Sequence, residues 1–195
     1  ITIGVVTGVQ GISWTELIIR GQSAHAGTTP MRLRHDPAFV AASIVAGVRG
    51  IATEMGGTQV ATVGRLELAP NLVNVVAASV TMTVDLRNTD EALLQQAEAR
   101  FVALCDELAA AEGVSIERRT LARFEPVEFD PSMVDSVERT ARTLGHSALR
   151  MPSGAGHDAQ MLARVCPTAM IFTQSVNGLS HNQAELTHPA DLQAG

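Results

Sequence analysis

Alternation of apolar and polar residues is clearest between Ser79 and Arg87. Apolar side chains occupy every second position and polar ones the positions between, the apolar set being Val80, Met82, Val84 and Leu86. Successive side chains of a strand point to opposite faces, so this run predicts a strand with one buried face. Such strands are typical of antiparallel sheets covered by helices on one side only. Three further β-rich runs predict strands at 12–22, 59–68 and 114–121.

Two helices are predicted between these strands. The first starts at Asp36-Pro37, an N-cap followed by a helix-starting proline, and ends at Gly56-Gly57. Its apolar residues recur every three or four positions, as expected for one buried stripe: Val40, Ile44, Val48, Ile51 and Met55.

The second helix carries a similar stripe from Leu94 to Ala111 and stops at Gly113. Asn88, with Glu91 three residues later, resembles a capping box for its start. The element order over 12–124 is therefore β-α-β-β-α-β. This order predicts a ferredoxin-like domain, with two helices on one face of a four-stranded sheet.

The flanking segments predict pieces of a second domain. Residues 1–11 contain Gly4 and Gly8, and we interpret them as a strand end and hinge rather than a core strand. Within 125–195 a helix opens at Asp130-Pro131, and the apolar run 168–172 predicts a strand buried on both faces. The overall fold class predicted is α+β, with a split α+β domain at 12–124 and part of an α/β domain at 125–195.

Composition excludes several kinds of protein. Hydrophobic residues make up 46% of the chain, which indicates a core-forming globular protein, and no uninterrupted apolar run is as long as a membrane span. A net charge of −6 argues against nucleic acid as a partner. The sequence has no lysine, so no Schiff-base chemistry is available. We expect Cys105 and Cys166 to be buried free thiols in a reducing cytoplasm rather than a disulfide. The chain starts at Ile1 in mid-pattern, as an internal piece of a longer protein would.

Candidate chemistry begins with two histidines. His25 follows the first predicted strand in a turn of small residues, where it is either an ordinary surface side chain or a group aimed at something outside its own domain. His181 follows the predicted strand 168–172, and α/β folds place functional groups at such strand ends. A lone histidine is more often structural, and a catalytic zinc takes about three protein ligands. The nearby Glu185, His188 and Asp191 follow no known ligand spacing.

Two other features have an ordinary and a functional interpretation. The glycine-rich turn 153–158 could cradle an anion, although we favour a structural turn in which Asp158 caps the next helix or orients His157. Arg87 could bind a carboxylate through its guanidinium fork or simply pair with Asp85. Asn74 offers an amide that both donates and accepts.

Five segments together resemble a known family: Ser-Ala-His-Ala-Gly-Thr-Thr-Pro-Met at 23–31, Pro-Asn-Leu-Val-Asn-Val-Val at 70–76, Thr-Val-Asp-Leu-Arg at 83–87, Ser-Gly-Ala-Gly-His-Asp-Ala at 153–159 and Gly-Leu-Ser-His-Asn at 178–182. They are similar, in order and spacing, to one branch of the di-metal aminoacylase/carboxypeptidase superfamily. That branch holds N-carbamoyl-L-amino-acid hydrolases, β-ureidopropionases and allantoate amidohydrolases.

The resemblance implies a hydrolase of C–N bonds other than peptide bonds, acting on a ureido carboxylate in the cytoplasm. It implies two bridged divalent metals, zinc or manganese, with His181 as one ligand. It also implies a lid that forms a homodimer, so that His25 reaches the partner's site and stabilises the oxyanion there. Asn74 and Arg87 would then bind the substrate, and Arg87 would contact the carboxylate of the substrate.

The resemblance also implies what this chain lacks. The family's other metal ligands and its general base match no residue here, so we expect no tightly bound metal and no hydrolysis by the 195-residue chain alone. Two alternatives remain: a stand-alone ferredoxin-like dimerisation or small-ligand module, and a dipeptidase or aminoacylase of the same superfamily. Which ureido substrate is used stays open.

Overall fold

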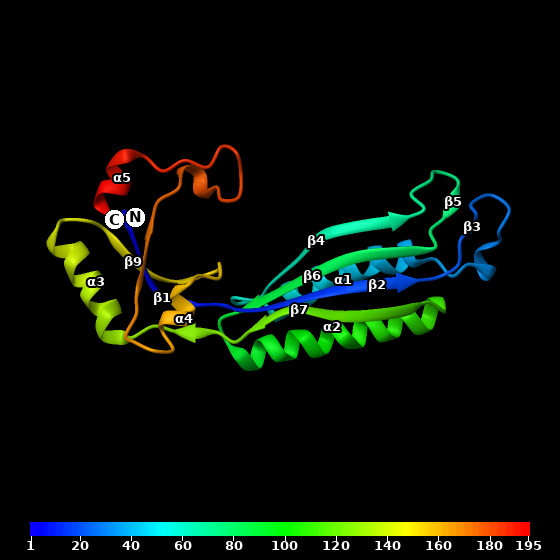
Figure 1. Cartoon of the computed structure of the whole chain (residues 1–195), viewed down its shortest axis with the longest axis horizontal. Helices are drawn as coiled ribbons and strands as arrows, with labels where there is room; N and C mark the ends of the chain where they lie inside the picture. Colours follow the sequence, from blue (N-terminus) through cyan, green and yellow to red (C-terminus); the bar gives the residue numbers. More distant parts are fainter. The chain divides into compact units, whose positions relative to one another are not determined.

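The computed structural model describes all 195 residues, which form two compact units. One unit, here called the continuous unit, comprises Gly11–Glu125. The other, called the split unit, combines Ile1–Gln10 with Pro126–Gly195. Figure 1 shows that the strands lie in several sheets accompanied by helices, so the protein has a mixed α+β fold.

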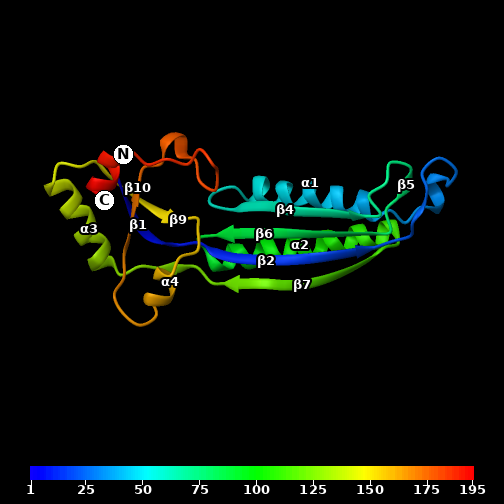
Figure 2. The same ribbon diagram turned by 45° about the horizontal axis from the view of Figure 1, so that its top comes forward.

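The continuous unit is built on a four-stranded antiparallel sheet with the strand order β4-β6-β2-β7. Its helices run along the length of the sheet (Figure 2) and share one core with it. The predicted order of strands and helices is present, with these bounds: β2 Gly11–Arg20, α1 Pro37–Met55, β4 Val60–Ala69, β6 Ser79–Asn88, α2 Glu91–Glu112 and β7 Ser115–Phe124.

The alternation of β6 places its apolar residues in this core, as predicted. Val80, Met82, Val84 and Leu86 are each at most 1% exposed, whereas the polar residues between them are half-buried. The α1 stripe is confirmed as buried at Val40, Ile44, Val48 and Ile51, whereas Met55 at its end is half-buried against the same core. The N-cap Asp36 accepts hydrogen bonds from the backbone N–H groups of Ala38 and Phe39.

Helix α1 is the one helix long and apolar enough to cross a membrane, by length and composition alone. Its buried residues include Val40, Ile44 and Val48, which pack in the core of the continuous unit. Packing against the sheet is therefore a sufficient reason for its apolar character.

The start of α2 differs from the predicted capping box. Asp90, not Asn88, is the N-cap, because the Asp90 carboxylate accepts from the N–H of Leu93 at 2.9 Å. Asn88 is instead the last residue of β6 and is 1% exposed. Its amide donates to Gln59 Oε1 and its Oδ1 accepts from the N–H of Asp90. Because Asn88 is buried at the end of the strand, its side chain is hydrogen-bonded there, and the exposed Asp90 caps the helix instead.

The split unit has β1 (Ile3–Val9) at its centre. Strand β1 pairs antiparallel with β10 and with β8, and parallel with β9. The longest of the remaining elements is the helix α3, Pro131–Thr143. The others are short: β8 Val127–Glu128, β9 Ala148–Ser153, α4 Ala159–Leu162, β10 Met170–Thr173, the 3₁₀ turn η2 Val176–Gly178 and α5 Pro189–Ala194.

Two predictions for this unit were wrong. Strand β1 is a core strand rather than a hinge, because Ile3, Val5, Val6 and Val9 are all buried. Its glycines mark close packing: a Cβ on Gly8 would lie 2.4 Å from the carbonyl oxygen of Val127. The strand predicted at 168–172 is not buried on both faces, because Ile171 of β10 is 45% exposed.

The core of the continuous unit predicts a large effect of truncating Leu17, which is fully buried in it. Leu17→Ala should lower the free energy of unfolding by about 2–5 kcal/mol, because a cavity is added to the lost burial. Urea unfolding followed through Trp14, the single tryptophan of the chain, reports on this unit. Leu66→Ala, at a position 46% exposed on β4, is the control. Equal losses in both variants would contradict the assigned core.

Candidate functional site

His25 lies at the end of the continuous unit's sheet. Beyond the last pair of β2 and β6, Arg20 with Ser79, the chain forms a separate two-stranded ladder of β3 (Ala24–His25) and β5 (Val75–Val76). Figure 1 shows this ladder past the end of the larger strands. The ladder continues in a hydrogen bond of 2.9 Å from the N–H of Ala26 to the carbonyl oxygen of Asn74. The structure therefore brings His25 and Asn74 together, both exposed.

The imidazole of His25 has one tautomer compatible with its contacts. Its Nδ1 lies 3.0 Å from the backbone nitrogen of Gly27 and 3.2 Å from that of Thr28. Both backbone N–H groups can only donate, so Nδ1 must accept, and the proton of the neutral ring is on Nε2. Nε2 has no hydrogen-bond partner within the chain. The site thus presents an N–H donor to whatever approaches the end of the sheet.

Arg87 lies at the opposite end of β6, paired with Ile12 on β2 and Val60 on β4. From Ser79 to Arg87 the strand extends over about 27 Å, at the antiparallel rise of about 3.4 Å per residue. A single copy of the chain therefore does not bring Arg87 together with His25 and Asn74.

The guanidinium of Arg87 is held by its surroundings. Nε donates to both oxygens of Asp85, at 3.0 and 3.1 Å, and Nη2 donates to one of them at 2.7 Å. Cζ lies 5.8 Å from the centre of the Trp14 ring. The ordinary interpretation of Arg87, an ion pair with Asp85, is therefore present. It fixes the guanidinium on the face of the sheet opposite the buried residues of β6.

His181 lies in an exposed loop of the split unit, after η2. Its φ is 54°, in the left-handed region, and its backbone N–H donates to Glu185 Oε2 at 2.9 Å. No group of three or more His, Cys, Asp or Glu side chains in the chain is arranged to hold a metal ion. The residues present therefore do not make a complete metal site, and His181 can be at most one ligand of such a site.

The turn 153–158 is held differently from the prediction. Asp158 makes no side-chain cap for α4, and it does not hydrogen-bond to His157. Asp158 is still the N-cap residue, but Nδ1 of His157, one residue earlier, accepts from the N–H of Ala159 at 3.0 Å. The buried Gln160 accepts from the N–H of His157. A histidine cap two residues before the helix has no strong sequence signal, which is why it was missed.

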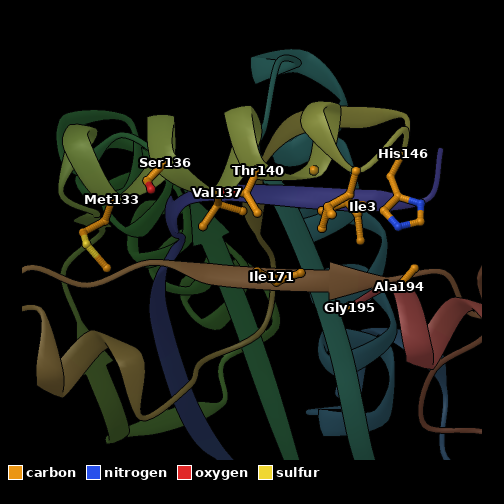
Figure 3. A pocket seen from close by; sticks show the side chains of 11 residues that line it. Ile3, Met133, Ser136, Val137, Thr140, His146, Ile171, Ala194 and Gly195 are labelled. Carbon is orange, nitrogen blue, oxygen red and sulfur yellow. The ribbon is translucent and has the colours of Figure 1, made fainter.

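One cavity of about 240 Å³ lies in the split unit between β1, α3, β10 and α5 (Figure 3). Its lining is largely apolar and includes Ile171, with Ile3 and Val137 facing the space and His146 at one end. None of the predicted site residues lines it. The cavity therefore does not help to define the candidate site.

Comparison with known proteins gives a consistent result. The sequence profile of peptidase family M20/M25/M40 matches residues 4–195 of this chain. The N-carbamoyl-L-amino-acid amidohydrolase of Rhizobium meliloti is 41% identical over 94% of this chain and 44% of its own length. The allantoate amidohydrolase of Escherichia coli is 39% identical over 100% of this chain and 47% of its own.

A crystal structure matches as well. An amidase of the hydantoinase/carbamoylase family from Burkholderia multivorans superposes with a TM-score of 0.94 at 40% identity. The match covers 99% of this chain and 47% of that one. The chain spans about half the length of the relatives that it matches.

The two cysteines differ, which corrects the prediction that both are buried. Both are free, but Cys105 is buried in the core and Cys166 is exposed. Burial raises the pKa of the Cys105 thiol to about 12, because a thiolate there would lose its hydration. Its predominant form at neutral pH is therefore the unreactive thiol.

We expect a thiol reagent such as DTNB to modify Cys166 alone in the folded protein at about pH 8. Cys105 should react only when denaturant is added. Cys166→Ser serves as the matched control and should remove the reaction of the folded state altogether. Two thiols titrating in the absence of denaturant would contradict this assignment.

Proposed function

The chain belongs to peptidase family M20/M25/M40, in the branch of N-carbamoyl-L-amino-acid and allantoate amidohydrolases, and from that premise we propose that it is part of a ureido-cleaving enzyme. The enzyme hydrolyses the carbamoyl C–N bond of an N-carbamoyl amino acid or of allantoate. The continuous unit is its ferredoxin-like lid and dimerisation domain, and the split unit is the C-terminal part of its catalytic domain. The strand order β4-β6-β2-β7 with two helices in one core supports the assignment of the lid.

The family is metal-dependent. We assign one ligand, His181, to a pair of zinc or manganese ions in the whole enzyme. The other ligands are not assembled in this chain. The chain's own residues would therefore supply this one ligand together with substrate binding and charge stabilisation. On the same grounds the 195-residue chain by itself should not hydrolyse a ureido substrate.

The observation that carries the proposal is the N–H donor that His25 presents. Addition of water to a ureido carbonyl moves negative charge onto the carbonyl oxygen. A fixed donor aimed at that oxygen stabilises the transition state more than the ground state, and removing one such donor costs about 3–4 kcal/mol. Neutral His25, with Nδ1 occupied and the proton on Nε2, is suited to this function.

The length of β6 supports a homodimer. Arg87 is proposed to bind the substrate carboxylate. Asn74, which lies next to His25 in the same unit, is also proposed to bind the substrate. Since about 27 Å of strand separates Arg87 from the other two, one small substrate cannot meet all three residues of one copy. In the proposed enzyme, Arg87 of one copy shares a substrate with His25 and Asn74 of the other.

Removing the proposed donor tests this function directly. His25→Ala in the whole enzyme should lower kcat by about a hundredfold or more and change KM little, because the interaction forms in the transition state. Met31→Ala, in the same loop and 75% exposed, is the control and should keep full activity. A His25→Ala enzyme with undiminished kcat would refute the proposal.

A different kinetic effect is expected at Arg87. Arg87→Lys should raise KM for an N-carbamoyl amino acid by at least about tenfold, because an ammonium cannot reproduce the guanidinium fork. The carboxamide analogue of the same substrate should be affected far less. Arg65→Lys, which alters a more exposed arginine paired with Glu67, is the control. An unchanged KM would show that Arg87 serves only its ion pair with Asp85.

A further inference from the structure

The turn that carries His25 depends on a side chain outside it. The turn is tied to itself by a hydrogen bond from the N–H of Thr29 to the carbonyl oxygen of His25, at 3.1 Å. Two other carbonyl groups, those of Ala26 and Thr29, point toward Arg34. Arg34 Nη2 donates to Ala26 at 2.6 Å and Nε donates to Thr29 at 3.1 Å.

Arg34 makes no ion pair with a carboxylate. Its half-buried guanidinium is hydrogen-bonded to the main chain of this one turn. Bonds from an ionised donor are roughly twice as strong as neutral ones, and the fork fixes two acceptors at once. The arrangement of the turn therefore depends strongly on this residue.

The carbonyl of Ala26 and the N–H of Gly27 belong to the same peptide group. Because the group is planar and trans, its oxygen and hydrogen point in opposite directions. When Arg34 holds the oxygen on one side, the hydrogen is directed to the other side, where Nδ1 of His25 lies 3.0 Å from the nitrogen. A cation on the carbonyl also polarises the peptide and strengthens its N–H as a donor.

We propose that Arg34 is a positioning residue for His25. It acts through the Ala26–Gly27 peptide, which keeps Nδ1 of the imidazole as an acceptor and its proton on Nε2. For its effect on catalysis the inference rests on the function proposed for His25. The tautomer itself is a property of the chain and is measurable without any substrate.

The sequence offers a matched pair of substitutions. Arg32 is two residues from Arg34, is exposed, and makes no hydrogen bond or ion pair through its side chain. Arg34→Met and Arg32→Met therefore remove the same charge from the same segment, but only the first removes the bonds to Ala26 and Thr29. Arg34→Gln is the milder second variant, in case Arg34→Met does not fold.

The ring nitrogens of His25 are observed by long-range ¹H–¹⁵N NMR of the 195-residue chain at about pH 8.5. The wild type and Arg32→Met should show one tautomer, protonated at Nε2. Arg34→Met and Arg34→Gln should show exchange between both tautomers, while the amide signals of the core remain. A single Nε2-protonated tautomer in a folded Arg34 variant would overturn the inference.

Kinetics of the whole enzyme separate this inference from the proposed function. Arg34→Met should lower kcat about tenfold and leave KM within about twofold, whereas Arg32→Met should change neither. Exchanging tautomers together with a lowered kcat support the inference. Exchanging tautomers with an unchanged kcat would support the link from Arg34 to His25 and overturn the catalytic function proposed for His25.

Discussion

Two backbone N–H groups directed at Nδ1 decide what His25 can do. They come from Gly27 and Thr28, and because neither can accept a hydrogen bond, the ring is left with a proton on its outer nitrogen. A histidine free to exchange tautomers would offer a donor for only part of the time. The proposed oxyanion interaction and the importance of Arg34 both depend on this local arrangement.

Strand β6 serves the fold and the site at once. Its alternate residues bury Met82 and its apolar neighbours in the core, and the strand is ten residues long and paired with β2 without a register shift. The same length separates Arg87 from the His25 end by about 27 Å. One small ligand bound to a single copy cannot contact both ends of a strand of that length. The separation is consistent with the proposal that the His25 end of the continuous unit acts on a second copy of the chain.

Local patterns predicted the continuous unit well, because its signals are carried by neighbours in sequence. The alternation of β6 and the stripe of α1 each predict which face of the element is buried. The split unit was predicted less well, because the burial of β1 depends on β9 and β10, which lie far away in sequence. Gly8 was interpreted as flexibility, yet it permits the close approach of Val127. The contacts of Arg34 with main-chain carbonyls follow no side-chain pattern, so the sequence did not indicate them.

The central claim is that one active site takes Arg87 from one copy of the chain and His25 from another. Mixing two variants of the whole enzyme, His25→Ala and Arg87→Ala, tests it most directly. Each variant alone should be nearly inactive. After subunit exchange, random pairing should restore about a quarter of the wild-type sites, because each mixed dimer holds one site with both residues intact. If mass spectrometry shows mixed dimers and the mixture remains as inactive as its parents, the two residues do not meet across subunits and the account is wrong.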